Sequence, residues 1–392
     1  MPGSFDGKLG LARAQTYVAS EAFSFLRACH FNDLPSPHSA VLYRMAHLTL
    51  TNVHQCYGDR PILRGVSWSL TGGQTGVVLG ASGSGKTTLL RSIAGLTPIK
   101  SGSIAIDSRD VTNVVAHRRG VAMGFQNDRL YPHQSIKRML VESARCGGDK
   151  DPRSTAKYVA DRLGVADHWH RLPDAISGGQ RQRISVAKAL LRRTPVCLFD
   201  EPLASNDVGR RESEMQWLRS VAHEMAQDRV WVLVTHDGDA ALRLADQLAV
   251  MRAGKLVQID SPEVIYQKPL FRSVAEAIGS PLVNWIDRHQ CPVGWESILG
   301  DSDGLAIRPH NVRLQEQTPM AGDDQLATRV VIETVRTIDR GTLVEARNSG
   351  DSSYCWRVLV HEGGYVPAIG QVVALMVKRE QIHSLPDDVT PT

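Results

Sequence analysis

Three segments follow one another in an order that restricts the fold to one group of nucleotide-binding proteins. A glycine-rich loop comes first, with the sequence Gly80-Ala81-Ser82-Gly83-Ser84-Gly85-Lys86-Thr87-Thr88. A polar run that begins Ile176-Ser177-Gly178-Gly179-Gln180 comes second, and an apolar run that ends in Asp200-Glu201 comes third. A glycine-rich loop alone indicates only that a protein binds nucleotides. The order of the three segments is therefore the strongest constraint in the chain.

The glycine-rich loop has the sequence context of a phosphate-binding loop. Residues 75–79 form a short apolar strand that runs into the loop, and Leu89, Leu90 and Ile93 recur after it at helical spacing. Glycines let backbone N–H groups converge on phosphate oxygens at a helix N-terminus, where the helix dipole already favours an anion. We therefore expect residues 80–88 to bind phosphate. The alternative is a Gly/Ser-rich surface turn, which this strand–loop–helix context disfavours.

The charged and hydroxyl residues around this loop suit a nucleoside triphosphate. Lys86 is expected to neutralise the β- and γ-phosphates, and the Thr87 hydroxyl to ligate Mg²⁺. Residues 196–199 form an apolar strand that delivers Asp200 and Glu201 to the carboxyl edge of a sheet. Asp200 suits an outer-shell hold on Mg²⁺, and Glu201 suits accepting a proton from the attacking water, a contribution of about 10²–10⁴-fold in rate. The alternative is a pair of solvated acids that end a strand.

Two further polar side chains end predicted strands. His236 follows the apolar strand 230–234, and Gln126 follows the apolar residues 121–125. The imidazole is expected at the same sheet edge as the acidic pair, and the glutamine amide within reach of Mg²⁺ or the lytic water. An isolated histidine is more often structural than catalytic. Only their positions make the two residues candidates for the site.

Composition limits the classes of protein that this chain can represent. Its 392 residues exceed the usual size of one hydrophobic core, so two domains are expected. The net charge of +4 is small and forms no block, so no nucleic-acid partner is expected. The six cysteines include no CxxC pair, which predicts neither a disulfide framework nor a zinc site. A reducing, cytosolic environment fits this cysteine usage.

The chain carries no stretch of the roughly 18 consecutive apolar residues that a membrane-spanning helix needs. Residues 1–44 lack the compact apolar segment of a secretory signal, and a strand-like pattern begins at Met45. We expect residues 1–44 to be a disordered extension or the product of an over-long start. The alternative is a membrane-surface helix over residues 17–31, which have some helical amphipathicity.

These residues together resemble the ATPase subunits of ATP-binding cassette (ABC) transporters, and more narrowly those of bacterial importers for maltose, polyamines and ferric iron. The resemblance covers about Met45 to the C-terminus. It implies an α/β P-loop cassette over residues 45–278, with a helical subdomain at about 127–181. It also implies ATP and Mg²⁺ as cofactors, and a dimer or paired cassette in which two copies face head to tail.

The same resemblance implies roles for individual residues. Tyr57 corresponds to the aromatic residue that stacks on adenine, with a tyrosine buried in the core as the alternative. Gln126 matches the Q-loop, Asp207 the D-loop and His236 the switch histidine. The signature run, residues 176–183, is implied to bind the γ-phosphate held by the other subunit. The residues of this run assigned to nucleotide binding are Ser177, Gly178, Gly179 and Gln180.

Two local features depart from the family's common pattern, and a third segment matches a docking surface of the family. Ile176 stands where the family has leucine, a change of shape that should matter little. The D-loop reads Ala204-Ser205-Asn206-Asp207, and Asn206 replaces a leucine that normally packs, so the coupling between the two ATP sites is in doubt. Residues 129–133, Arg-Leu-Tyr-Pro-His, correspond to the surface on which a membrane subunit docks. The simpler interpretation of that segment is a Pro-containing helix start with a buried tyrosine, and both interpretations can hold at once.

The C-terminal part, residues 279–392, has the pattern of a small β-barrel. Alternating apolar segments separated by Gly and Asp occur at 328–335, 343–347, 356–360 and 372–378. Residues 306–309 and 370–373 resemble the oligonucleotide-binding-like (OB-like) regulatory domain of importer ATPases. A packing domain without a ligand is the alternative, because no binding residue stands out.

The expected function is that of the ATP-hydrolysing subunit of an ABC transporter, an importer of solutes. ATP binding would close the dimer and hydrolysis would reopen it, which drives a membrane permease fed indirectly by a solute-binding protein. Peripheral attachment to the cytoplasmic face of the inner membrane follows. The alternatives are a soluble ABC ATPase not linked to transport and a non-hydrolysing regulatory protein. No residue identifies the transported solute.

Overall fold

A computed structural model of the chain describes residues 45–124, 130–203, 208–225, 228–291, 294–316, 325–338, 340–349 and 354–387. The strands before residue 262 are β1 His47–Tyr57, β2 Arg60–Thr71, β3 Thr75–Leu79, β4 Ser101–Ile106, β5 Arg109–Asp110, β6 Val121–Gly124, β7 Val196–Asp200, β8 Val230–Thr235, β9 Gln247–Arg252 and β10 Lys255–Asp260. The helices up to residue 277 are α2 Lys86–Ala94, α3 Ile136–Cys146, α4 Pro152–Arg162, α5 Gly178–Leu191, α6 Val208–Met225, α7 Gly238–Leu244, α8 Pro262–Gln267 and α9 Arg272–Ala277.

The apolar runs predicted as buried strands form the centre of a six-stranded sheet in the order β10-β9-β3-β8-β7-β6. Every residue of β3, β7 and β8 is buried, as expected for strands covered on both faces. The pairs β3–β8, β7–β8 and β6–β7 are parallel, and β10 pairs antiparallel with β9. The predicted strands that lead to the phosphate loop and the acidic pair are thereby confirmed.

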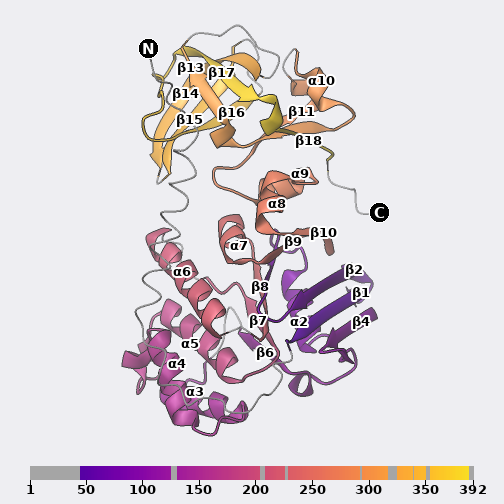
Figure 1. Cartoon of the computed structure of the whole chain (residues 1–392), viewed down its shortest axis with the longest axis vertical. Helices are drawn as coiled ribbons and strands as arrows, with labels where there is room; N and C mark the ends of the chain where they lie inside the picture. Colours follow the sequence, from indigo (N-terminus) through magenta and orange to yellow (C-terminus); the bar gives the residue numbers. More distant parts are fainter. Residues whose placement is uncertain are drawn as a thin grey trace, which may run out of the picture. The chain divides into compact units, whose positions relative to one another are not determined.

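A second, antiparallel sheet has the order β2-β1-β4-β5. A turn at Gly58-Asp59 joins β1 to β2, and Gly58 has a φ of 58°. Figure 1 shows α2 beside β1, β2 and β4. Leu89, Leu90 and Ile93 of α2 are fully buried in a core that includes residues of both sheets. This packing fixes the helix that follows the phosphate loop.

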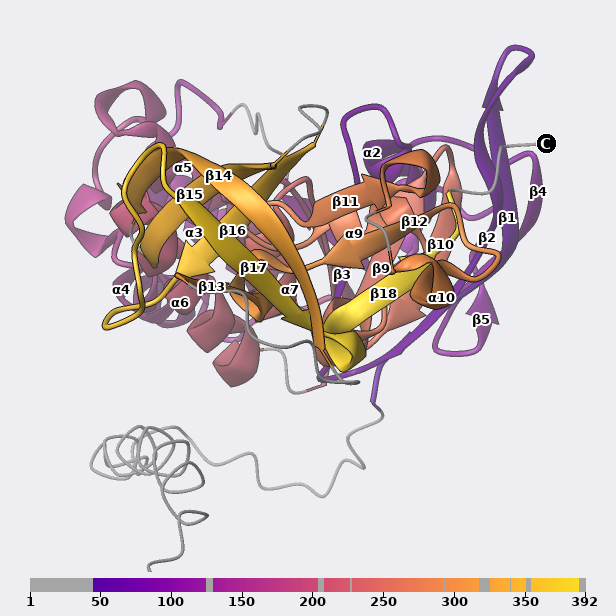
Figure 2. The same ribbon diagram turned by 90° about the horizontal axis from the view of Figure 1, so that it is seen from above.

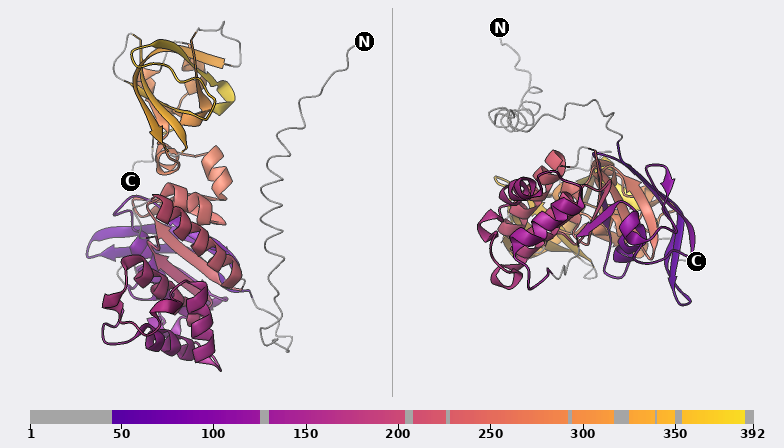
Figure 3. Two further views of the ribbon diagram at one scale, coloured as in Figure 1. Left: turned by 90° about the vertical axis from the view of Figure 1, so that its left-hand side faces the viewer. Right: turned by 90° about the horizontal axis from the view of Figure 1, so that it is seen from below.

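The segment between β6 and β7 contains the helices α3, α4 and α5, in agreement with the helical subdomain that the resemblance implies. Its helices α3, α4 and α5 pack on one another, and Figure 3 shows them as a magenta group. Ile136 and Met139 of α3 and Val159 of α4 are buried in the same core as Phe199 of β7. Side chains cap the helix starts, with Ser135 accepting from the backbone N–H of Arg138.

The C-terminal part contains two antiparallel sheets, ordered β11-β12-β18 and β13-β17-β14-β15-β16. Their elements are β11 Asn284–Asp287, α10 Glu296–Leu299, β12 Gly304–Ile307, β13 Val312–Gln315, β14 Gln325–Ile338, β15 Gly341–Asn348, β16 Cys355–Val360, β17 Val372–Lys378 and β18 Ile382–Leu385. Figure 2 shows β14, β15 and β16 as a curled sheet, which agrees with the predicted barrel-like domain. The buried residues Trp295 and Trp356 pack edge to face in its core.

No helix in the described part of the chain is long and apolar enough to cross a membrane. Residues 1–44, expected to be a disordered extension or the product of an over-long start, lie outside that part, so this expectation stays a prediction.

Candidate ATP-binding and hydrolysis site

The parallel register of the central sheet places the candidate residues at one edge. Leu79, the last residue of β3, pairs with Thr235 of β8, and Asp200, the last residue of β7, pairs with Val234 of β8. The next residues in the chain are Gly80, His236 and Glu201. Parallel strands end on the same side, so this edge collects the phosphate loop, the acidic pair and the histidine.

The backbone of the phosphate loop requires glycine at two positions. A Cβ at Gly80 would lie 2.4 Å from the carbonyl oxygen of Met251 and 2.8 Å from the Ser84 hydroxyl oxygen. Gly85, the N-cap residue of α2, has a φ of 111°, which other residues avoid. The buried Ser84 hydroxyl has no hydrogen-bond partner among the described residues. A buried polar atom without a partner at a helix N-terminus fits a phosphate ligand.

Lys86 turns its ammonium group back onto the phosphate loop. Its Nζ donates to the carbonyl oxygen of Gly80 at 2.7 Å and to that of Ala81 at 2.9 Å. Burial lowers the pKa of Lys86, and the nearby carboxylates of Glu201 and Asp200 oppose that shift. The cation is therefore held inside the loop, between backbone oxygens and two acids.

Thr87 and Asp200 form a direct hydrogen bond, a contact that cannot be predicted from the sequence. The Thr87 hydroxyl donates to Asp200 Oδ1 at 3.2 Å. Burial raises the pKa of the Asp200 carboxyl, and the hydrogen bond from Thr87 opposes that shift. A hydroxyl and a carboxylate are hard oxygen ligands of the kind that Mg²⁺ prefers. The pair fits the predicted magnesium site.

Glu201 and His236 form the second pair at the sheet edge. Nδ1 of His236 lies 2.9 Å from Oε1 of Glu201, and the ring N–H donates to the carboxylate. The Glu201 side chain is 15% exposed and that of His236 is 66% exposed. A carboxylate offers about four acceptor positions, so this bond leaves Glu201 able to accept from a water.

The signature run forms the start of α5. Ser177 is its N-cap and accepts from the backbone N–H of Gln180, whose side chain accepts from the backbone N–H of Ser177. Ser177 and Gly178 are exposed, and Gly179 is partly exposed. None of the hydrogen bonds described for residues 177–180 reaches residues 80–88. The helix N-terminus is thus presented at the surface of the subunit.

Two candidates identified by resemblance can be compared with their alternatives. Tyr57 ends β1 and is 51% exposed, so the alternative of a core tyrosine is wrong. In the docking segment Leu130 is buried, whereas Tyr131 is 54% exposed and lies under Lys188, with 5.7 Å between Nζ and the ring centroid. The alternative of a buried tyrosine is wrong there too, because the neighbouring Leu130 supplies the core contact. Pro132 is exposed.

The remaining candidate residues lie either outside the described residues or away from the two pairs at the sheet edge. Gln126 and the D-loop residues Asn206 and Asp207 lie outside the described residues, and their predicted roles stay predictions. Ile176 is 6% exposed and packs in the helical core, so it fills a buried position in place of the usual leucine. Thr88 follows Thr87 in the first turn of α2 and is partly buried.

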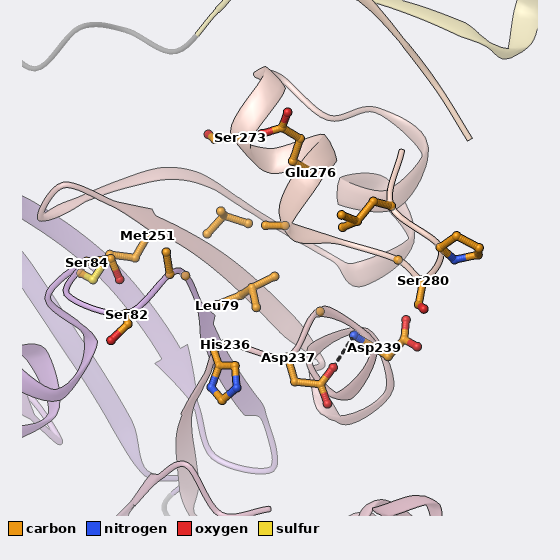
Figure 4. Close-up of a pocket in the computed structure, with 18 of the residues that line it drawn as sticks. Leu79, Ser82, Ser84, His236, Asp237, Asp239, Met251, Ser273, Glu276 and Ser280 are labelled. Atoms are coloured by element: carbon orange, nitrogen blue, oxygen red, sulfur yellow. Dashed lines mark hydrogen bonds between the residues drawn. The ribbon is translucent and has the colours of Figure 1, made fainter. Parts of the chain in front are cut away.

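The cavity of about 1200 Å³ drawn in Figure 4 borders the phosphate loop without being the phosphate site. Its lining includes residues 80–84 and 236–239, together with Ile338 and Leu343 of the C-terminal part. Lys86, Thr87, Asp200 and Glu201 do not line it. The hydrogen bond drawn in Figure 4 joins the Asp239 backbone N–H to the Asp237 carboxylate.

An ion pair between Arg340 and Asp239, which both line this cavity, joins the C-terminal part to α7. Nη2 of Arg340, between β14 and β15, lies 2.8 Å from Oδ2 of Asp239, and Nη1 donates to the carbonyl oxygen of Ser280. Asp239 lies in the first turn of α7, three residues after His236. The C-terminal part therefore contacts the helix that follows the candidate switch histidine.

Comparison with known proteins agrees with this geometry. The profile of the ABC transporter family matches residues 63–204. The sn-glycerol-3-phosphate import ATP-binding protein UgpC 2 of Agrobacterium fabrum is 35% identical over 319 residues, which are 79% of this chain and 85% of that protein. The UgpC protein of Rhodopseudomonas palustris is 34% identical over 356 residues, 86% of this chain and 97% of that one.

A solved structure shows the same fold. The ADP conformation of MJ1267, an ATP-binding cassette of an ABC transporter, aligns with a TM-score of 0.50 and 21% identity. The alignment covers 57% of this chain and 96% of that one. With relatives that match most of its length and a cassette fold around the phosphate loop, the chain belongs to the family of ATP-binding subunits of bacterial ABC importers.

Proposed function

We propose that the site at the sheet edge hydrolyses ATP with Glu201 as the general base. The observation that carries this proposal is the meeting of two pairs, Thr87 with Asp200 and Glu201 with His236, beside the loop that contains Lys86. One pair suits a metal and the other suits a water. Asp200 and Glu201 are adjacent at the end of one strand, so a metal and an attacking water would lie side by side. Phosphoryl transfer to water requires both.

The proposed mechanism assigns one task to each group. The backbone N–H groups of residues 80–88 and the Lys86 ammonium bind the phosphates, which places the γ-phosphate at the N-terminus of α2. Thr87 and Asp200 would hold Mg²⁺, which would supply positive charge to neutralise the phosphate oxygens. Glu201 takes a proton from the attacking water, and His236 orients the Glu201 carboxylate through Oε1. Tyr57 provides an exposed ring on which the adenine stacks.

The proposed active assembly is a head-to-tail pair of cassettes. Ser177 and Gly178 are exposed at the N-terminus of a 14-residue helix, which favours an anion, and they make no described hydrogen bond to the phosphate loop of their own subunit. A second subunit can supply that anion as the γ-phosphate of its ATP. Each site would then consist of one subunit's loop and the other subunit's signature run, and ATP would join the two.

Transport requires a membrane partner, which we propose to be a permease that contacts the helical region at Tyr131. An exposed tyrosine beside an exposed proline is a suitable contact, because tyrosine is enriched at protein interfaces. The subunit would thereby attach to the cytoplasmic face of the inner membrane. The similar UgpC proteins are named for sn-glycerol-3-phosphate import, so that compound, delivered by a solute-binding protein, is the first solute to test.

Co-purification with membrane permease subunits tests the transport proposal. The substitution Tyr131→Asp should weaken assembly by a few kcal/mol, because a charge would be buried without a partner at the contact. Tyr131→Phe is the matched control and should assemble normally. The ATPase rate of the isolated subunit should survive both substitutions. Equal recovery of all three forms would refute the docking surface, and recovery of none would favour a soluble ATPase.

A further inference from the structure

The backbone of Glu201 has an unusual conformation. Its φ is 48°, in the left-handed region, where a side chain with a Cβ costs about 1–2 kcal/mol. Glu201 follows β7 directly, so this conformation sets the direction in which the carboxylate leaves the strand. A residue in a disfavoured conformation is retained only where its surroundings hold it. The contacts of Glu201 therefore bear on its proposed role as general base.

Three atoms of Glu201 are held by three different partners. Its backbone N–H donates to the carbonyl oxygen of Val234 at 3.0 Å, and its Oε1 accepts from His236 at 2.9 Å. Both partners belong to β8 or the residues just after it. Its carbonyl oxygen accepts from Nε2 of Gln182 at 3.1 Å. Among these bonds, only that of Gln182 comes from a helix, and that helix is α5.

Gln182 also links Glu201 to the signature run. It lies in the helix capped by Ser177, five residues after the cap, and is only partly exposed. An α-helix is rigid over such a short distance, because its backbone hydrogen bonds close every turn. A change in the position of Ser177 would therefore move the amide of Gln182, and with it the carbonyl of Glu201.

We infer that Gln182 is a positioning residue, which fixes the left-handed backbone of Glu201 and ties the general base to the signature run of its own subunit. This inference rests on the proposed role of Glu201. In the proposed head-to-tail dimer, on which the inference also rests, the signature run would contact the nucleotide of the other subunit. The hydrogen bond of Gln182 would then connect the signature run, at the ATP site of the other subunit, with Glu201, the proposed general base at the ATP site of its own subunit.

The isosteric variants Gln182→Met and Gln182→Glu test the hydrogen bond itself. Methionine keeps the approximate shape and removes the donor, so kcat for ATP should fall about tenfold, which corresponds to ~1.4 kcal/mol. Glutamate puts an oxygen against the Glu201 carbonyl, so its kcat should fall further. KM for ATP should change less than about twofold for both, because Gln182 lies outside the phosphate loop. Gln216→Met, an exposed change on α6, is the matched control and should keep the wild-type kcat.

A second measurement separates positioning from a general loss of structure. In a Glu201→Gln background, Gln182→Met should leave ATP-dependent dimerisation unchanged, because glutamine at 201 keeps the carbonyl and the nucleotide contacts are intact. Loss of dimerisation would show that Gln182 supports the fold of α5 and would overturn the inference.

The outcomes also distinguish this inference from the proposed function. Wild-type turnover of Glu201→Gln would refute both the role of Glu201 as general base and the inference about Gln182. An inactive Glu201→Gln with a wild-type kcat in Gln182→Met and Gln182→Glu would overturn the inference alone. We expect kcat to decrease from the wild type to Gln182→Met and further to Gln182→Glu, with KM for ATP nearly unchanged.

Discussion

At the scale of single residues, the site contains the oppositely charged groups Lys86 and Asp200, and burial disfavours the charged form of each. Burial lowers the pKa of Lys86 and raises the pKa of Asp200, so each shift favours the neutral form. Each group in turn opposes the shift of the other. Phosphate near Lys86 and a cation near Asp200 would favour the charged forms of both. The binding of ATP with its metal is therefore expected to stabilise this edge of the sheet.

The exposed ring of Tyr57 gives a prediction about affinity. Tyr57→Ala should raise KM for ATP about tenfold with little change in kcat, because stacking of a base on an aromatic ring contributes ~1–3 kcal/mol. Tyr57→Phe keeps the ring and should behave as the wild type. Steady-state hydrolysis over a range of ATP concentrations measures both constants. An unchanged KM in the alanine variant would show that the adenine lies elsewhere.

At the scale of elements, the helix behind the phosphate loop depends on a buried arginine that sequence reasoning misses. Arg119 is 5% exposed, and burial lowers its pKa. Its guanidinium donates to four backbone carbonyl oxygens, two of them in the last turn of α2, at Ser92, Ile93, Thr112 and Val114. Cations at a helix C-terminus also interact favourably with the helix dipole. Arg119 thereby holds the end of α2 opposite to the phosphates.

Arg119→Met should lower the free energy of unfolding by ~3 kcal/mol, because it leaves buried carbonyl oxygens without donors. The neighbouring Arg118 is exposed, and Arg118→Met is the matched control, with an expected change below about 0.5 kcal/mol. Urea unfolding followed by circular dichroism compares the two. Equal stability of both variants would mean that water satisfies the carbonyls as well as Arg119 does.

These elements differ in how far sequence can predict them. The strands β3, β7 and β8 are predictable because each is a short apolar run that ends in a polar residue, and the P-loop is predictable from its glycines and Lys86. The partners of Arg119 and Gln182 are not predictable, because an arginine or glutamine carries no local signal of which distant carbonyl it meets. The burial of Leu130 beside the exposed Tyr131 likewise depends on how α3 packs.

At the scale of the whole molecule, the proposed composite site predicts complementation between two inactive subunits. Lys86→Ala removes the phosphate-binding cation, and Ser177→Arg blocks the signature run, so each variant alone should be inactive. Mixed dimers contain one site with both groups intact, so mixing should restore part of the activity. Titration of one variant against a fixed amount of the other measures the recovery. A wild-type rate from Ser177→Arg alone would mean that each subunit hydrolyses ATP unaided.

The proposed role of Glu201 in activating water at the ATP site can be tested by one comparison of purified proteins. Turnover and molecular mass should be measured for the wild type and Glu201→Gln with ATP and Mg²⁺. We expect Glu201→Gln to bind ATP, to lose about two to four decades of hydrolysis, or ~3–5 kcal/mol of barrier stabilisation, and to accumulate as an ATP-bound dimer. Wild-type turnover by a Glu201→Gln protein that stays monomeric would contradict this role of Glu201.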